Sequence, residues 1–174
     1  MLRVMSDLLV RLYDLPDLEP SRRRMRDAGI IVRRSMPYER TPVRRWIAER
    51  FSIDWADEFE ATLGNPPAGT VLAIRGGELL GFACHDATAR GFFGPTGVAS
   101  EHRGSGIGHA LLLEALHRMR LAGYGYAIIG GVGPEAFYRN AVDAMPIPDS
   151  QPGIYAHRLR GEPGTGETNP PTDA

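Results

Sequence analysis

The sequence GVASEHRGSGIGHALL, residues 97–112, predicts the end of a strand, a glycine-rich turn and the first turns of a helix. Glycine lacks a Cβ atom, so a ligand can approach the main chain closely in such a turn. The first N–H groups of a helix have no intrahelical partners and lie at the positive end of its dipole, which favours anions. Arg103 adds a charged donor just before Gly104, Gly106 and Gly108. The stretch therefore predicts a site for phosphate or pyrophosphate.

The spacing of these glycines narrows the class of phosphate loop. A P-loop needs a lysine after its last glycine, and the sequence contains no lysine. The dinucleotide pattern G-x-G-x-x-G is also missed, because the glycines recur at every second position. What remains is Arg-x-x-Gly-x-Gly from Arg103 to Gly108, preceded by Val98 at a strand end. This pattern resembles the acyl-CoA pyrophosphate loop of the Gcn5-related N-acetyltransferase (GNAT) superfamily. A glycine-rich helix start without a ligand is the alternative for the loop taken alone.

Composition limits the class of protein. A chain of 174 residues suits one domain with a sizeable core. The formal charge of −1 gives no large field that favours nucleic acid. No run of about 18 apolar residues predicts a membrane span, and charged residues interrupt the apolar N-terminus, which makes it a poor signal peptide. Cys84 is the single cysteine and cannot form an internal disulfide. We therefore expect a cytoplasmic protein without nucleic-acid or membrane partners.

Hydrophobic periodicity predicts the elements before the glycine-rich stretch. Apolar runs place strands at residues 29–36, 70–74, 79–84 and 91–99. Helical spacing of aromatic and aliphatic residues places helices at residues 41–51 and 54–63. Gly76-Gly77 is a hairpin signal between the second and third strands. Gly94-Pro95 inside the fourth strand indicates a bulge or a bend.

Two N-terminal segments have more than one interpretation. Residues 8–15 (LLVRLYDL) are either a short strand or an apolar helical turn that Pro16 closes. Residues 21–27 (SRRRMRD) predict a basic helical turn that ends at Gly29. Its three consecutive arginines form either a solvated face or a patch for phosphate or an acidic partner.

A helix, a strand, a short helix and a last strand are predicted after the glycine-rich stretch. The first helix has an apolar stripe opposite a polar face that includes Glu114. The apolar run at residues 124–129 predicts a central strand. Pro134 can open the short helix, and residues 154–159 predict the last strand. The tail from Gly161 lacks apolar residues, which predicts disorder.

The predicted order of elements indicates an α+β layered domain with a mixed sheet. The same order is found in the GNAT superfamily, so the resemblance spans about residues 29–159. It implies an α/β/α layered domain around a mixed, mostly antiparallel sheet that is splayed at the acyl-CoA site. The expected organisation is an N-terminal extension at residues 1–28, the acetyltransferase domain at residues 29–160 and the disordered tail at residues 161–174.

The resemblance implies that acetyl-CoA is the co-substrate and assigns two catalytic roles. Val98 matches the strand-end position whose backbone pairs with the pantetheine arm, and its N–H is the natural donor to the oxyanion. Tyr138 matches the tyrosine that faces the CoA sulfur, where it can protonate the departing thiolate or hydrogen-bond to it. A tyrosine that only packs in the core is the alternative for Tyr138. The residues implied to bind the pyrophosphate, in several cases through backbone N–H groups, are Arg103, Gly104, Ser105, Gly106, Ile107, Gly108 and His109.

The sequence departs from the family pattern after residue 129. Gly131 stands where the family usually has an asparagine that touches the CoA arm. Asp143-Ala144 replaces the glycine-aromatic pair that usually follows the tyrosine. The assignments after residue 129 therefore rest on fewer matching positions than the loop.

The general base is left open. The carboxylate and imidazole candidates, each of which also has an ordinary structural interpretation, are Asp57, Glu58, His85, Asp86 and Glu135. A chain of water molecules could replace any of them. Cys84 is interpreted as a buried strand thiol. The five histidines show no metal-ligand spacing, so no metal is expected.

These features predict an N-acetyltransferase that moves the acetyl group of acetyl-CoA directly to a primary amine. A small-molecule acceptor, namely an amino sugar, amino acid or polyamine, is favoured over a protein, as in a bacterial small-molecule branch of the family. The resemblance also leaves a homodimer open. A non-catalytic acyl-CoA-binding regulatory module is the alternative, and a nucleotide-binding structural domain is a third hypothesis.

Overall fold

The structure is a computed structural model that describes residues 6–159. Its strands are β1 (Leu8–Arg11), β2 (Ile31–Arg34), β3 (Thr70–Arg75), β4 (Glu78–His85), β5 (Phe92–Val98), β6 (Tyr126–Ile129) and β7 (Met145–Pro146). Its α-helices are α1 (Glu19–Asp27), α2 (Arg40–Arg50), α3 (Ile53–Thr62), α4 (Ile107–Leu121) and α5 (Glu135–Val142). The 3-10 turns are η1 (Leu12–Asp14), η2 (Pro37–Glu39), η3 (Ser100–His102) and η4 (Gly153–Tyr155). The tail predicted to be disordered lies outside the described residues.

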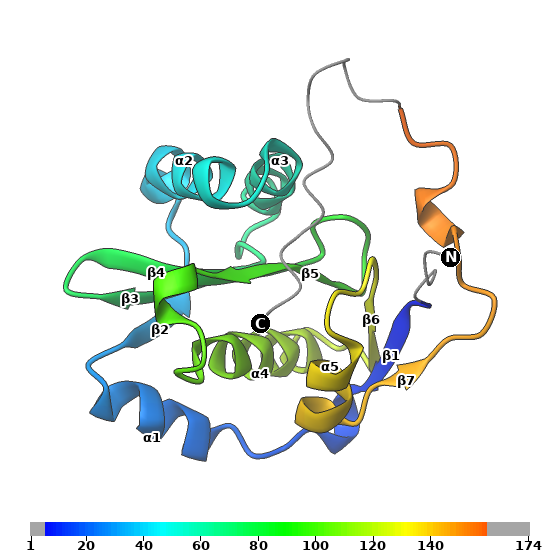
Figure 1. Ribbon diagram of the computed structural model, residues 1–174, viewed down its shortest axis with the longest axis horizontal. Coiled ribbons are helices and arrows are strands. Elements are labelled where there is room, and N and C mark those ends of the chain that lie inside the picture. Colours follow the sequence, from blue (N-terminus) through cyan, green and yellow to red (C-terminus); the bar gives the residue numbers. More distant parts are fainter. Residues whose placement is uncertain (1–5, 160–174) are drawn as a thin grey trace.

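All seven strands belong to one sheet in the order β2-β3-β4-β5-β6-β1-β7. The β5–β6 pair is parallel and the other pairs are antiparallel. Helices α2 and α3 cover one face of the sheet, and α4, α1 and α5 lie on the other (Figure 1). This arrangement confirms the predicted α/β/α layered domain around a mixed, mostly antiparallel sheet.

Local sequence signals fix several of these elements. Gly76 and Gly77 have φ of 57° and 82° in the turn between β3 and β4, as a tight hairpin turn requires. The Ser52 hydroxyl accepts a hydrogen bond from the Trp55 N–H (3.1 Å) and caps the start of α3. Gly123 follows α4 with φ of 99°, the left-handed conformation that ends many helices.

Each face of the sheet has its own hydrophobic core. The larger core lies between the sheet and α4, and the smaller one lies beneath α2 and α3 around Phe59 and Phe82. Helix α4 is buried around most of its circumference. Glu114, predicted on a polar face of this helix, is therefore only 3% exposed. Its carboxylate is compensated by ion pairs with Arg22 and Arg118.

The N-terminal segment is part of the sheet. Strand β1 pairs with β6 along all four of its residues and with β7 on its other side. Of the two interpretations of residues 8–15, the strand describes Leu8–Arg11 and a helical turn describes Leu12–Asp14. Residues 6–28 therefore do not form an extension outside the domain, because their apolar side chains complete the larger core.

The strand predicted at residues 154–159 is wrong. Residues 153–155 form η4, and no strand follows it in the described part of the chain. Gly153 and His157 have positive φ of 53° and 64°, which is incompatible with extended backbone. Leu159 is 97% exposed, so its side chain is not buried against the sheet. The place beside β6 is taken by β1.

Candidate functional site

The site predicted from the sequence lies where β5 runs past the end of β6. The two strands pair only at Phe92–Ile128 and Phe93–Ile129, and β6 ends there. Strand β5 continues through Gly94–Val98 with β4 as its single neighbouring strand among the described residues. One edge of this part of β5 is therefore left without a strand partner.

The main chain of Val98 faces that open edge. The Ala99 N–H donates to the Leu80 carbonyl at the end of the β4–β5 ladder (2.9 Å). Successive residues of an antiparallel ladder alternate between its two sides. The N–H and C=O groups of Val98 consequently point away from β4. Its carbonyl accepts a long hydrogen bond from Arg103 Nε (3.4 Å), which draws Arg103 back toward the strand end.

The glycine-rich turn leads directly from this strand end into α4. Gly104 and Gly106 both have positive φ, 73° and 88°, and Gly106 is the residue that precedes the helix. The Ser105 hydroxyl donates to the His102 carbonyl (2.6 Å) and braces the turn. The first helical hydrogen bond runs from the Ala110 N–H to the Gly106 carbonyl (3.0 Å). The N–H groups of residues 107–109 therefore have no intrahelical acceptor.

The turn brings the predicted phosphate residues together as one donor surface. Arg103 and His109 are half-buried, and Gly104 and Ser105 are exposed. Ile107 turns its side chain into the core. A Cβ at Gly108 would make an ordinary van der Waals contact with Val98 Cγ2 (3.6 Å). The orphan N–H groups, the arginine and the close approach that glycine allows fit a pyrophosphate group.

Tyr138 reaches the same core from α5. Its side chain is 6% exposed, and its ring packs edge-on against Phe93 and Phe137, with centroid distances of 6.3 and 5.1 Å. Its hydroxyl has no hydrogen-bond partner among residues 6–159. Burial raises the pKa of Tyr138 to about 12, so the phenol keeps its proton at neutral pH and can donate it.

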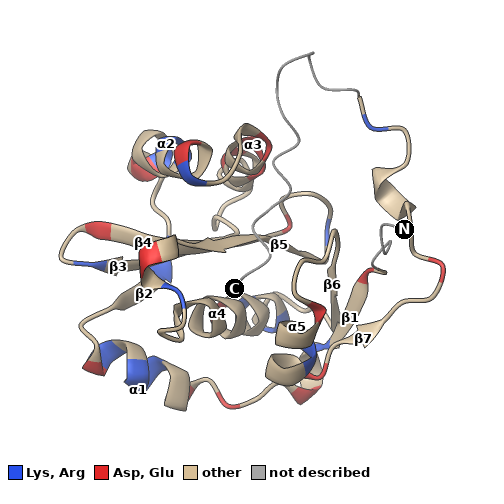
Figure 2. Ribbon diagram, in the orientation of Figure 1, with Lys and Arg blue, Asp and Glu red and all other residues tan. Residues whose placement is uncertain are grey.

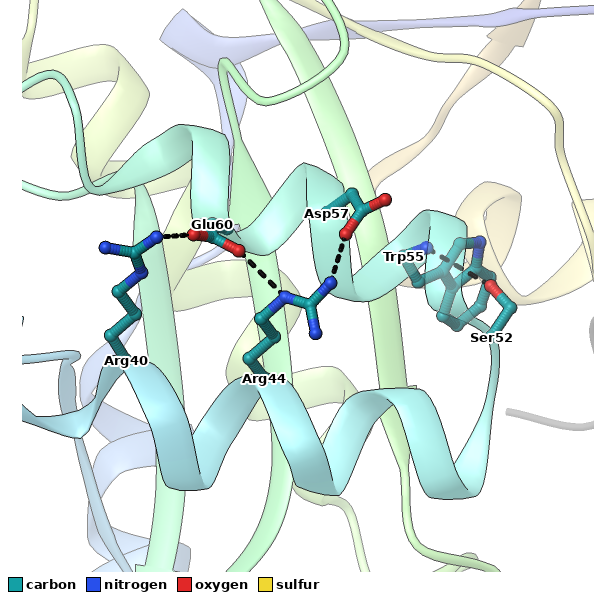
Figure 3. Close-up of polar contacts among 6 residues, drawn as sticks. All are labelled: Arg40, Arg44, Ser52, Trp55, Asp57 and Glu60. Atoms are coloured by element: carbon teal, nitrogen blue, oxygen red, sulfur yellow. Dashed lines mark hydrogen bonds and ion pairs between the residues drawn. The ribbon is translucent and has the colours of Figure 1, made fainter.

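The opposite face of β5 lies beneath the helical pair α2–α3. A Cβ at Gly97 would lie 2.5 Å from the Phe51 ring, so the aromatic side chain covers the strand there. Phe51 also stacks on Trp55 (5.3 Å between centroids). Figure 3 shows how the two helices are joined, with Arg44 of α2 bound to both Asp57 and Glu60 of α3.

The candidate bases have different surroundings. Asp57 is exposed and engaged by Arg44, and Glu135 forms an ion pair with Arg139 one turn along α5 (3.1 Å). Glu58 is partly buried, and its carboxylate accepts a hydrogen bond from the Thr88 hydroxyl. Burial raises the pKa of Glu58 above its usual value, although the Thr88 hydrogen bond opposes the shift.

His85 and Asp86 form a structural pair. Asp86 accepts hydrogen bonds from the Gly91 N–H (2.7 Å) and the Tyr124 hydroxyl (2.9 Å) and contacts His85 Nδ1 (2.9 Å). Burial disfavours its charge, but these hydrogen bonds hold the pKa of Asp86 below its usual value. Asp86 therefore fastens the loop between β4 and β5. Its carboxylate has little freedom to act as a base.

Cys84 is buried in the smaller core. Burial raises the pKa of its thiol to about 12, which keeps it neutral and poorly nucleophilic. Within residues 6–159, no group of three or more His, Cys, Asp and Glu side chains is placed to hold a metal ion. No helix in the same range is long and apolar enough to cross a bilayer.

One arginine outside the predicted loop lies on it. A Cβ at Gly106 would be 2.8 Å from Arg24 Cζ and 3.0 Å from Arg24 Nε, so the guanidinium of α1 rests against the turn. Arg22, Arg23 and Arg24 are all exposed, as the solvated-face interpretation predicts, and Arg24 in addition contacts the glycine-rich turn. Arg24 and Gly106 are far apart in the sequence, so no local sequence pattern predicts this contact.

The sheet, its open edge at β5 and the glycine-rich turn together define the class of fold predicted from the sequence. A family model described as the acetyltransferase (GNAT) family matches residues 33–139. The match covers more than half of the chain, and the protein therefore belongs to the GNAT acetyltransferase family. No curated protein sequence matches the chain significantly.

Solved structures show the same fold. A glucosamine N-acetyltransferase region of a fungal multi-domain β-N-acetylglucosaminidase matches 82% of this chain and 19% of its own, with a TM-score of 0.67 and 17% identity. A GCN5-related N-acetyltransferase from Sphaerobacter thermophilus matches 82% of this chain and 48% of its own (TM-score 0.61, 20% identity). A GNAT family acetyltransferase from Brucella melitensis, in complex with acetyl-CoA, matches 64% of this chain and 80% of its own (TM-score 0.50, 21% identity). The present chain thus spans less than half the length of the first two.

Proposed function

We propose that the protein transfers the acetyl group of acetyl-CoA directly to a primary amine of a small molecule. The observation that carries this proposal is the open edge of β5. The main-chain groups of Val98 face this edge, and the glycine-rich turn follows at once. An extended pantetheine arm can pair with such an edge as an added strand would. Membership of the GNAT family supports the same reaction class.

The turn is the proposed binding site for the pyrophosphate. The N–H groups at the start of α4 and the charged Arg103 side chain would hold the two phosphates. Gly104 and Gly106 adopt positive φ, and with Gly108 they let the ligand approach the backbone. Ser105, Ile107 and His109 would contribute N–H groups.

Acetyl-CoA supplies the reactive thioester when it is bound. The Val98 N–H would donate to the carbonyl oxygen, where negative charge develops. The protonated Tyr138 phenol would donate to the sulfur as it leaves. Both groups belong to elements that the larger core holds in place, so they need little rearrangement before the reaction.

Glu58 is the proposed base. Its raised pKa makes it a better proton acceptor at neutral pH than an ordinary glutamate. It belongs to α3, on the face of the sheet opposite α5. The amine would therefore meet Glu58, and the leaving sulfur would meet Tyr138. A water molecule could carry the proton over any remaining distance.

The acceptor is proposed to be an amino sugar, an amino acid or a polyamine. The fungal structural neighbour is described as a glucosamine N-acetyltransferase, which makes amino sugars the first class to test. Asp57 and Glu60 near the α2–α3 surface are neutralised by arginines (Figure 3). Their neutralisation favours an acceptor with one amine over a polycation.

Thiol release from acetyl-CoA, followed against amino sugars, amino acids and polyamines, tests the proposal. We expect release with one class of acceptor. Tyr138→Phe should lower kcat about 100-fold and leave the affinity for CoA within about twofold. Tyr126→Phe is the matched control, because Tyr126 is half-exposed at the start of β6.

Two results would contradict this function. Binding of CoA without release against any acceptor would favour the non-catalytic regulatory module. Protection against thermal unfolding by ATP or NAD as strong as that by CoA would favour a nucleotide-binding structural domain.

A further inference from the structure

The contact between Arg24 and the glycine-rich turn comes from a part of the chain that the family model does not match. The match begins at residue 33, whereas α1 spans Glu19–Asp27. The Arg24 guanidinium lies directly over Gly106, the residue that precedes α4. The start of α4 therefore has a basic neighbour in addition to Arg103 of its own loop.

Helix α1 is held against α4 by a specific pair of contacts. Arg22 binds the Glu114 carboxylate through two hydrogen bonds, from Nε to Oε2 (3.1 Å) and from a terminal nitrogen to Oε1 (3.0 Å). Met25, on the neighbouring turn, is 2% exposed in the larger core. Arg22 and Met25, three residues apart, lie on one face of α1 and fix the helix against α4, and the exposed Arg24 side chain reaches the turn at Gly106.

The positive charge of Arg24 is not compensated by an ion pair among the described residues. Arg22 and Arg26 of α1 have carboxylate partners in Glu114 and Glu19, but Arg24 has none within residues 6–159. The acid on the adjacent turn, Glu101, is engaged by Arg50 (3.0 Å). Figure 2 shows the basic residues of α1 as blue segments of its ribbon, beneath the sheet.

Arg24 also acts on His109 and lies at the start of α4. Burial, and then the charge of Arg24, lower the pKa of His109 below its usual value. The start of α4 adds the positive end of a 15-residue helix dipole. A bound polyanion would be attracted by both the Arg24 charge and the helix dipole.

We propose that Arg24 is a phosphate-binding residue for CoA, supplied by α1 to the site of the GNAT fold. This inference rests on the proposed function, because it assumes that the turn binds the CoA phosphates. A guanidinium gives charge-assisted, bidentate hydrogen bonds to phosphate oxygens. Its position over Gly106 allows it to act together with the N–H groups of residues 107–109. Arg22 is then a positioning residue, since it orients α1 through Glu114.

Calorimetric titration of the full chain with CoA tests the inference. Arg24→Ala should raise Kd about tenfold, which corresponds to one charge-assisted hydrogen bond of an exposed side chain. Arg23→Ala is the matched control. Arg23 is the neighbouring exposed arginine of α1, also without an ion pair in the described range, and its substitution should change Kd by less than about twofold. In steady-state kinetics, Arg24→Ala should raise the KM for acetyl-CoA and leave kcat unchanged.

The same titration with dephospho-CoA separates two sources of the phosphate. If Arg24→Ala also lowers the affinity for dephospho-CoA tenfold, Arg24 contacts the pyrophosphate. If the loss of affinity disappears with dephospho-CoA, Arg24 contacts the 3′-phosphate. An independent readout is the His109 pKa from NMR titration, which should rise in Arg24→Ala because a nearby positive charge is removed. Alanine favours the helix, so α1 should remain folded.

The failures of the two proposals are distinguishable. Wild-type protein that does not bind CoA would contradict the proposed function itself. Wild-type protein that binds CoA with the same Kd as Arg24→Ala would overturn only the role of Arg24. Equal losses in Arg24→Ala and Arg23→Ala would also overturn it, because they would show a general effect of charge.

Discussion

Replacing Gly106 by alanine places one methyl group between the start of α4 and the Arg24 guanidinium. Gly106 has φ of +88°, and its new Cβ would lie 2.8 Å from Arg24 Cζ. Real side chains do not tolerate so short a contact. Arg24 is exposed, and its long side chain can adopt other rotamers, so we expect it to move aside and the fold to persist.

The structure separates two effects of this substitution. An L-residue in the left-handed region costs roughly 1–2 kcal/mol, and the loss of glycine freedom in the unfolded chain returns about 0.4–1 kcal/mol. The net loss of about 1 kcal/mol lowers Tm by ~2–4 °C for a domain of this size. Displacement of Arg24 should remove the proposed charge-assisted hydrogen bond to phosphate, about 1.5 kcal/mol at an exposed site, or roughly tenfold in Kd for CoA.

Gly123→Ala is the matched control, because it isolates the backbone effect. Gly123 follows the other end of α4 with φ of +99°, and a Cβ at this position would have no neighbouring atom within 4 Å. Thermal unfolding should therefore show similar decreases in Tm for both variants. Calorimetric titration with CoA should show the tenfold weakening for Gly106→Ala alone.

An unchanged Kd for CoA in Gly106→Ala, with a lowered Tm, would refute the reasoning. It would mean that the main chain at the start of α4 is not approached by the ligand and that Arg24 makes no contact with it. Weakening by Gly123→Ala as well would indicate that loss of helix stability alone explains the effect.

Two further substitutions test other parts of the molecule. Glu58→Gln should lower kcat and remove the decline of kcat at acidic pH. Because the pKa of Glu58 is raised, the wild-type decline should begin at a higher pH than for an ordinary glutamate. Asp57→Asn should leave this decline unchanged. An acidic decline that is identical in Glu58→Gln would contradict its role as base. Glu114→Ala should reduce the free energy of unfolding in urea by about 3 kcal/mol, because it leaves Arg118 without its buried partner. Glu19→Ala, which removes an exposed ion pair, should cost less than about 1 kcal/mol; equal losses would show that burial of Glu114 has no special effect.

Local signals predicted the elements that local interactions determine. The hairpin at Gly76-Gly77 and the glycine-rich turn follow from backbone conformations that few other residues adopt. Hydrophobic periodicity was sufficient for α3 and for β3 to β5, because their apolar faces match the cores they contact. The layered fold could therefore be predicted from these signals, whereas the splayed edge of the sheet was implied only by the resemblance to the GNAT family.

The remaining features depend on contacts between distant segments. The place of β1 beside β6 joins residues at opposite ends of the domain, and nothing in residues 8–11 specifies that partner. The apolar residues at 154–159 resembled a strand, but positive φ at Gly153 and His157 and the lack of a covered face prevent one. Glu114 was predicted on a polar helix face, but α1 packs over it and its carboxylate is buried.

The segment before residue 33 bears on the candidate site in two places, although the family match excludes it. Strand β1 pairs with β6 along its whole length, and so supports the strand whose end at Ile129 opens the edge of β5. Helix α1 carries Arg24 to the start of α4, where the phosphates of CoA are proposed to bind. The family segment supplies the turn and the open strand β5, while the N-terminal residues pair with β6, the neighbour of β5, and add charge to the turn. Variation in that segment is thus expected to alter affinity for CoA without altering the groups proposed for acyl transfer.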